Sequence, residues 1–108
     1  MITTQVTDSS RGVAAAHVPV DLDFFISGHG WRAVGQGNTD GAGFIRDFGE
    51  PPVAGIYRLA FDVAQYAPDS MFPTITITFE VRDPGAGCHL PLVLTAYGYS
   101  TYRTSSIA

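Results

Sequence analysis

Three histidines and one cysteine are the side chains of this sequence best suited to acid–base or nucleophilic chemistry near neutral pH. Cys88 and His89 are neighbours, and such a pair suggests a thiolate nucleophile with a histidine base. Residues 89–95 form an apolar run typical of a strand, however, and adjacent strand residues point to opposite faces of a sheet. His89 therefore cannot activate Cys88 directly, and we expect Cys88 to be a small, partly buried thiol.

The other histidines and the single cysteine give little support to a metal site. His17 and His29 lie beside turn residues, which predicts that both side chains are solvated. One cysteine cannot form an internal disulfide or an all-cysteine zinc site. Gly28 and Gly30 flank His29 without the strand–helix context of a phosphate-binding loop.

The charges exclude one large class of partner. All six basic residues are arginines, they are scattered singly, and the formal net charge is −4. A nucleic-acid-binding surface needs clustered positive charge, so nucleic acid is not an expected partner. No apolar run approaches the roughly 20 residues of a membrane span, and residues 1–4 do not resemble a signal peptide. We expect a cytoplasmic single domain over residues 1–108, with no membrane partner.

The histidines and Cys88 lie among short runs of alternating apolar and polar residues, which predict strands. Residues 74–81 alternate most clearly, residues 18–25 and 55–62 less so, and residues 89–95 are more continuously apolar. Pro91 lacks an N–H donor, which predicts an edge strand or a bulge there. Residues 63–66 are predicted to form one helical turn, ended by Pro68. Seven or eight strands with turns every 8–12 residues predict an all-β sandwich.

Several motifs, in order along the chain, carry a family resemblance. Residues 97–105 read Tyr-Gly-Tyr-Ser-Thr-Tyr-Arg-Thr-Ser, similar to the C-terminal Gly-Tyr-Ser-Thr-Tyr-Arg-Gly-Ser of the transthyretin-related 5-hydroxyisourate hydrolases. Residues 89–94, His-Leu-Pro-Leu-Val-Leu, resemble that family's His-Val-Pro-Leu-Leu-Leu strand. Residues 55–59, 71–73 and 8–20 match further family segments. The chain therefore resembles this family over nearly its whole length.

The resemblance implies a prealbumin-like sandwich assembled as a homotetramer, with active sites at the dimer–dimer interface. The family reaction adds water to the bicyclic, purine-derived 5-hydroxyisourate and opens one ring, without a metal or an organic cofactor. The family's His-x-His before the proline-containing strand reads Gly-Cys-His here, which leaves one potential metal ligand.

Two of three polar family positions are changed in this sequence. His89 matches the family histidine before the proline-containing strand and is the predicted acid–base group. Gln5 stands where the family has a water-activating histidine, and Gln cannot take a proton near neutral pH. Ala42 stands where a turn arginine holds the substrate. Arg46, four residues on, lies about 13 Å further along an extended chain and is expected to be a poor substitute.

The C-terminal motif supplies the remaining candidates. Tyr102 and Arg103 match the family's Tyr-Arg, and the resemblance implies catalytic or substrate-holding roles for both. The alternative for Arg103 is an ion pair with an acidic neighbour such as Asp8. Ser105 is expected to border the substrate, together with Gln5 and Ala42. The tail 106–108 extends past the usual family end and could narrow the pocket.

Three functions stay open at this point. The first is a true 5-hydroxyisourate hydrolase that acts through His89. The second is a biosynthetic or other specialised enzyme of the same ancestry that opens, closes or rearranges another small cyclic substrate. The third is a small-molecule carrier like transthyretin. Gln5 and Ala42 argue against the first function, and His89 with Tyr102 and Arg103 argues against the third, so the second is favoured.

Overall fold

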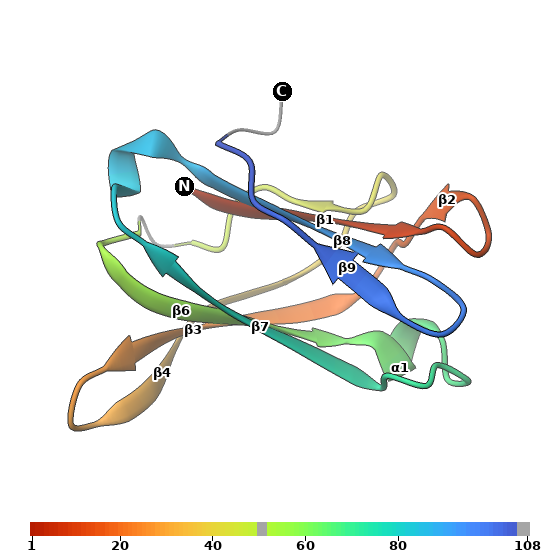
Figure 1. Cartoon of the computed structure of the whole chain (residues 1–108), viewed down its shortest axis with the longest axis horizontal. Coiled ribbons are helices and arrows are strands. Elements are labelled where there is room, and N and C mark those ends of the chain that lie inside the picture. Colours follow the sequence, from red (N-terminus) through yellow and green to blue (C-terminus); the bar gives the residue numbers. More distant parts are fainter. Residues whose placement is uncertain (50–51, 106–108) are drawn as a thin grey trace.

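Two β-sheets face each other in the computed structural model, which describes residues 1–49 and 52–105 (Figure 1). The first sheet contains β1 (Ile2–Asp8), β2 (Val13–Ala14), β5 (Phe44–Ile45), β8 (Cys88–Leu94) and β9 (Tyr99–Thr101). The second contains β3 (Pro19–Ile26), β4 (Gly30–Asn38), β6 (Gly55–Asp62) and β7 (Thr74–Val81). The predicted all-β sandwich is confirmed. The described residues form nine strands rather than seven or eight, because β2 and β5 are two-residue pairings with β1.

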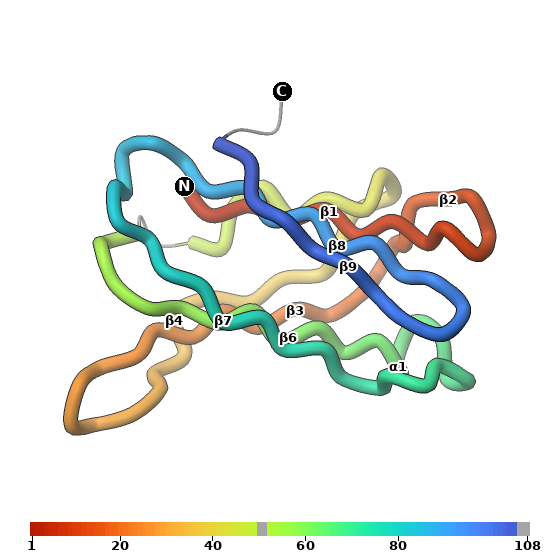
Figure 2. The backbone as a smooth tube through the Cα atoms, in the orientation of Figure 1, coloured from red at the N-terminus to blue at the C-terminus, as the bar shows by residue number. Residues whose placement is uncertain are grey.

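The sheets differ in strand direction. The second sheet has the order β4-β3-β6-β7 and is antiparallel throughout. In the first sheet β1 and β8 run parallel, although they lie at opposite ends of the sequence. Figure 2 shows the red N-terminal strand and the blue β8 side by side. This pairing brings the N-terminal residues next to the strand that carries His89.

Alternation along the strands builds the core between the sheets. Val20 and Leu22 on β3, Leu59 and Phe61 on β6, and Val6 on β1 are at most 4% exposed. The next residue in each strand points outward, as expected from the period of two. The outer face of the first sheet is therefore free to carry polar groups.

The helical content is small and largely matches the prediction. Helix α1 (Val63–Tyr66) is the single turn that the sequence predicts, and the Asp62 side chain accepts a hydrogen bond from the Gln65 N–H at its start. A 3₁₀ turn, η1 (Pro84–Ala86), joins β7 to β8. Within the described part of the chain, no helix is long and apolar enough to cross a membrane.

Pro91 lies in an interior strand, which corrects the expectation of an edge. Strand β8 pairs with β1 on one side and with β9 on the other. The β8–β9 ladder runs from Leu94 to Leu92 and resumes as a single bridge between His89 and Thr104. Pro91 lies in this gap, where no hydrogen bond from its backbone nitrogen to β9 is needed.

Candidate functional site

His89 is held on the outer side of the first sheet by a partner from the other end of the chain. The parallel register places Thr3 beside His89, and Thr3 Oγ1 lies 2.8 Å from His89 Nδ1. The backbone of His89 also exchanges two hydrogen bonds with Thr104, at 2.9 and 2.8 Å. The residue is 5% exposed. Because Nδ1 is engaged by Thr3, proton transfer by His89 has to pass through Nε2.

Burial shapes the protonation of this imidazole. Desolvation lowers the pKa of His89 below its ordinary value of 6.5, and a hydrogen bond with the backbone of Thr3 opposes that shift in part. The neutral ring is therefore the dominant form at neutral pH. A neutral imidazole can accept a proton, which suits the acid–base role that the sequence predicts.

Gln5 and Ala42 meet next to this histidine. Gln5 follows Thr3 by two residues on β1 and therefore shares its face. Gln5 Nε2 donates a hydrogen bond of 3.3 Å to the carbonyl oxygen of Ala42. Phe44 pairs with Gln5 across β1 and β5, and its ring lies 6.1 Å from the His89 ring, tilted by 25°. The fold thus brings together three of the six residues predicted for the site: His89, Gln5 and Ala42.

The turn before β5 is fixed by one carboxylate. Asp40 Oδ1 accepts hydrogen bonds of 2.9 Å from the N–H groups of Ala42 and Phe44. The bond from the Phe44 N–H is the main cause of a lowered pKa of Asp40. Gly43 then approaches β1 so closely that an added Cβ would collide with the carbonyl oxygen of Val6, and its φ is +84°. The turn is therefore held by these hydrogen bonds and packs directly against β1.

Arg46 packs on Phe44, the residue whose ring lies beside His89. Its guanidinium carbon is 4.0 Å from the centre of the Phe44 ring. Its Nη1 donates to Asp40 Oδ2 at 3.0 Å. The ion pair draws the side chain back along the turn, so that Arg46 covers the aromatic ring that contacts His89.

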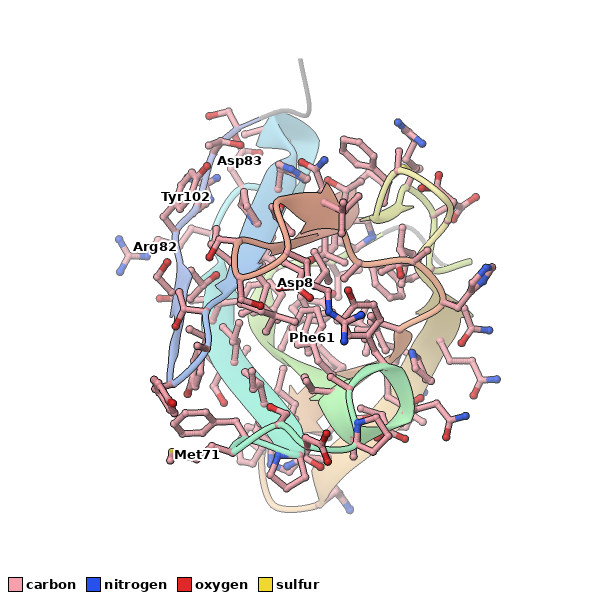
Figure 3. The ribbon with its side chains drawn as sticks, turned by 90° about the vertical axis from the view of Figure 1, so that its right-hand side faces the viewer. Asp8, Phe61, Met71, Arg82, Asp83 and Tyr102 are labelled. Carbon is pink, nitrogen blue, oxygen red and sulfur yellow. The ribbon has the colours of Figure 1, made fainter. Side chains whose placement is uncertain are left out.

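Tyr102 lies on the exposed margin of the first sheet. It is 57% exposed, and Figure 3 shows it at the edge of the molecule, on the same side as Arg82. Tyr102 precedes Thr104 by two residues, and Thr104 bridges to His89. Tyr102 is therefore near the His89 strand, but its ring is open to solvent in the single chain.

Arg103 and Ser105 lie apart from the Thr3–His89 pair. Arg103 Nη2 donates to the carbonyl oxygen of Gly87 at 3.2 Å, and the side chain lines a charged hollow with Glu80, Arg82 and Asp83. Ser105 is exposed and its backbone packs against Gly87. Within one chain Arg103 thus bonds to the strand start before His89, and its predicted role as a substrate clamp stays a prediction. The tail 106–108 lies outside the described residues.

The alternative for Arg103, an ion pair with Asp8, is wrong. Asp8 is buried and accepts hydrogen bonds from the hydroxyls of Ser10 and Tyr66, at 2.6 and 2.8 Å. Its nearest guanidinium is that of Arg11, at 3.7 Å. Burial raises the pKa of Asp8, but these hydrogen bonds and the Arg11 charge outweigh burial and lower it. Asp8 thus anchors α1 and the first turn instead of the C-terminal segment.

The remaining candidates behave as expected. Cys88 is 4% exposed and belongs to the hydrophobic core, on the face opposite to His89. His17 and His29 are exposed, and His17 has a positive φ of 62° in its turn. The Cys-His pair is therefore no nucleophile–base pair.

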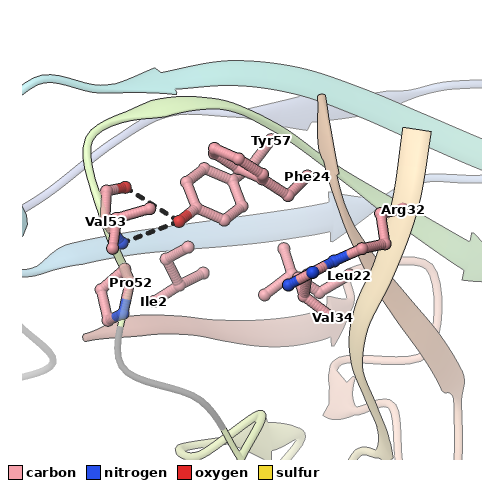
Figure 4. Close-up of a pocket in the computed structure, with 8 residues that line it drawn as sticks. All are labelled: Ile2, Leu22, Phe24, Arg32, Val34, Pro52, Val53 and Tyr57. Atoms are coloured by element: carbon pink, nitrogen blue, oxygen red, sulfur yellow. Dashed lines mark hydrogen bonds between the residues drawn. The ribbon is translucent and has the colours of Figure 1, made fainter. Parts of the chain in front are cut away.

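A separate cavity of about 130 Å³ opens between the sheets near the start of β1. Figure 4 shows it enclosed by apolar side chains, with the Tyr57 hydroxyl bonded to the backbone of Val53 and Arg32 extending toward the space. No residue predicted for the site lines this cavity, so the two features are distinct.

Thr3, Phe44 and Asp40 lie around the candidate site but were not predicted from the sequence, and Arg46 was expected to lie too far along the strand. Thr3 shares the period of two with Gln5, which was a usable signal for its face. The sequence did not predict that β8 pairs in parallel with β1, because strand pairing depends on the whole sheet.

Comparison with known proteins adds to this geometry. A model of the HIUase/Transthyretin family matches residues 2–104. The uric acid degradation bifunctional protein TTL of Arabidopsis thaliana is 38% identical over 96% of this chain, which spans only 37% of that protein. The 5-hydroxyisourate hydrolase of Salmonella dublin is 33% identical, covering 97% of this chain and 81% of the relative. That of Deinococcus radiodurans is 35% identical, covering 96% and 95%.

Solved structures agree on the fold. The crystal structure of sea bream transthyretin in complex with thyroxine superimposes with a TM-score of 0.90 at 22% identity, covering 99% of this chain and 97% of that one. A second transthyretin structure, from Sparus aurata, gives 0.88 at 24% identity, covering 95% of each chain. The prealbumin-like sandwich is thereby confirmed, and the chain belongs to the HIUase/Transthyretin family.

Proposed function

We propose that this chain is an enzyme of hydroxyisourate hydrolase ancestry that acts on a small cyclic substrate with His89 as its acid–base group. The observation that carries the proposal is the Thr3–His89 pair, a buried imidazole fixed through Nδ1 on a face that also holds Gln5. The relatives named 5-hydroxyisourate hydrolase support a hydrolytic reaction.

The proposed step is the opening of a cyclic amide by water. The oxygen of water bonds to a ring carbonyl carbon, and the ring carbon–nitrogen bond then breaks. His89 Nε2 takes one proton from the attacking water and returns it to the departing nitrogen, so the reaction balances with water as the only co-reactant. Gln5 would orient the water or a ring N–H, because its amide donates and accepts but does not ionise.

The identity of the cyclic substrate decides between two forms of this enzyme. 5-Hydroxyisourate is the first compound to test, because several relatives carry its name. A redeployed enzyme with another heterocyclic substrate is the favoured reading. The hydrogen bond from Gln5 to Ala42 supports it, because two groups that cannot ionise occupy this part of the site.

Assembly belongs to the same proposal. Tyr102 and the outer face around Gln5 are open in the single chain, so a second subunit would be needed to enclose a substrate. We propose a homotetramer in which such faces meet, with a small molecule as the other partner.

The test is a decay assay for 5-hydroxyisourate with three proteins. We expect His89→Ala to lower turnover by about 10²-fold or more, the usual loss for a general base. The double variant Gln5→His with Ala42→Arg is expected to raise it above wild type, because it adds an ionisable group and a guanidinium at two adjoining positions. Circular dichroism checks the fold, and His89→Gln serves as a second variant that retains a polar side chain in the buried position.

The outcomes separate the functions. Full activity in both His89 variants would overturn the acid–base role of His89. An inactive wild type with an active double variant would overturn the original hydrolase function, and both a redeployed enzyme and a carrier predict it. High wild-type activity that falls with His89→Ala would support the original hydrolase.

A further inference from the structure

Arg46 differs from Arg11 and Arg58 in the residues that surround it. Its guanidinium covers the Phe44 ring, and that ring contacts His89. Arg11 and Arg58 lie over the rings of Tyr66 and Trp31 elsewhere in the fold. The positive charge of Arg46 is therefore placed at the border of the Gln5–His89 face.

The guanidinium is held in place before any ligand arrives. Asp40 binds it through Nη1, and Asp40 is itself fixed by the N–H groups of Ala42 and Phe44. A guanidinium has five N–H donors, so the bond to Asp40 leaves others for a ligand. Arg46 is 55% exposed, so these donors are accessible. A cation already oriented loses little conformational entropy on binding.

The chemistry of this border selects a class of ligand. A planar guanidinium on an aromatic ring suits the carbonyl or enolate oxygens of a planar, acidic heterocycle, which it can bind through two parallel N–H bonds. We infer that Arg46 is the substrate-binding cation of this site and makes the contact that Ala42 cannot make. This inference rests on the proposed function for the location of the site, but not on which ring is opened.

The experiment measures binding and turnover separately. Urate, a planar anion, serves as the binding probe and caffeine, a neutral planar purine, as its counterpart. We expect Arg46→Gln to weaken urate binding roughly tenfold or more while leaving caffeine binding unchanged, since the lost contact is a charge-assisted hydrogen bond. In the decay assay the same variant should raise KM by a similar factor with a smaller change in kcat.

Matched variants make the result specific. Arg82→Gln removes a more exposed arginine, which is paired with Glu80 as Arg46 is paired with Asp40, and should change neither urate binding nor KM. Arg46→Lys should lie between wild type and Arg46→Gln, because a point charge lacks the planar fork. Adding Ala42→Arg to Arg46→Gln should restore urate binding, because position 42 adjoins Gln5 on the same border.

The two proposals fail in different ways. If wild type binds urate through Arg46 but turns over nothing, the enzyme proposal fails and the inference stands. If wild type is active and Arg46→Gln changes neither KM nor urate binding, the inference is overturned and the enzyme proposal stands. Equal loss of caffeine and urate binding would also overturn it, because charge would then play no part.

Discussion

The imidazole of His89 combines burial with a fixed orientation. Thr3 engages Nδ1 and so leaves Nε2 for proton transfer, and desolvation lowers the pKa so that the neutral ring dominates at neutral pH. These two features are what a general base requires. Neither property belongs to His17 or His29, which lie exposed in turns.

The lowered pKa of His89 predicts the pH dependence of the reaction. A base works in its unprotonated form, so kcat/KM should rise with pH and reach half of its plateau below 6.5. The measurement is a pH–rate profile of wild type, with His29→Gln as the control that removes an exposed histidine and should keep the midpoint. A midpoint above 6.5 would contradict the prediction.

At the scale of elements, the turn between Asp40 and Phe44 decides where the site lies relative to β1. Gly43 has no side chain, and its carbonyl oxygen accepts a hydrogen bond of 2.8 Å from the N–H of Val6. A positive φ and the close approach to Val6 both require glycine at this position. The site therefore depends on a residue that takes no part in its chemistry.

Gly43→Ala should destabilise the protein by about 1–3 kcal/mol, through backbone strain and the collision with Val6. Gly41→Ala is the matched control, since an added Cβ there meets nothing within 4 Å, and we expect less than about 0.5 kcal/mol. Urea unfolding followed by circular dichroism measures both. Equal stability of the two variants would show that the turn relaxes without cost.

At the scale of the whole molecule, the single chain leaves large side chains in solvent along one margin. Tyr97, Tyr99 and Tyr102 are 81%, 42% and 57% exposed, and all belong to β9 or its flanking residues. Covering such a surface removes apolar area from water and favours association. The same margin borders the strand of His89.

The proposed homotetramer predicts that light scattering gives the mass of four copies of the 11.5-kDa chain. If the site needs two subunits, specific activity should fall on dilution below the concentration at which the assembly dissociates. A monodisperse monomer with full activity would contradict both the tetramer and the shared site.

Local pattern was enough to predict much of this protein. The period of two identified β7 and the core faces, and Pro68 limited α1 to one turn. Opposite orientation of Cys88 and His89 followed from strand geometry alone. These features depend on residues close together in the sequence, so the sequence by itself determined them.

Tertiary structure decided the rest. Thr3 meets His89 across 86 positions, because β1 pairs in parallel with β8 and local pattern does not specify a partner strand. Arg46 lies over the Phe44 ring and pairs with Asp40, while Arg103 bonds to the carbonyl oxygen of Gly87. Side-chain direction of this kind is set by contacts between distant segments, and those contacts exist only once the two sheets have packed together.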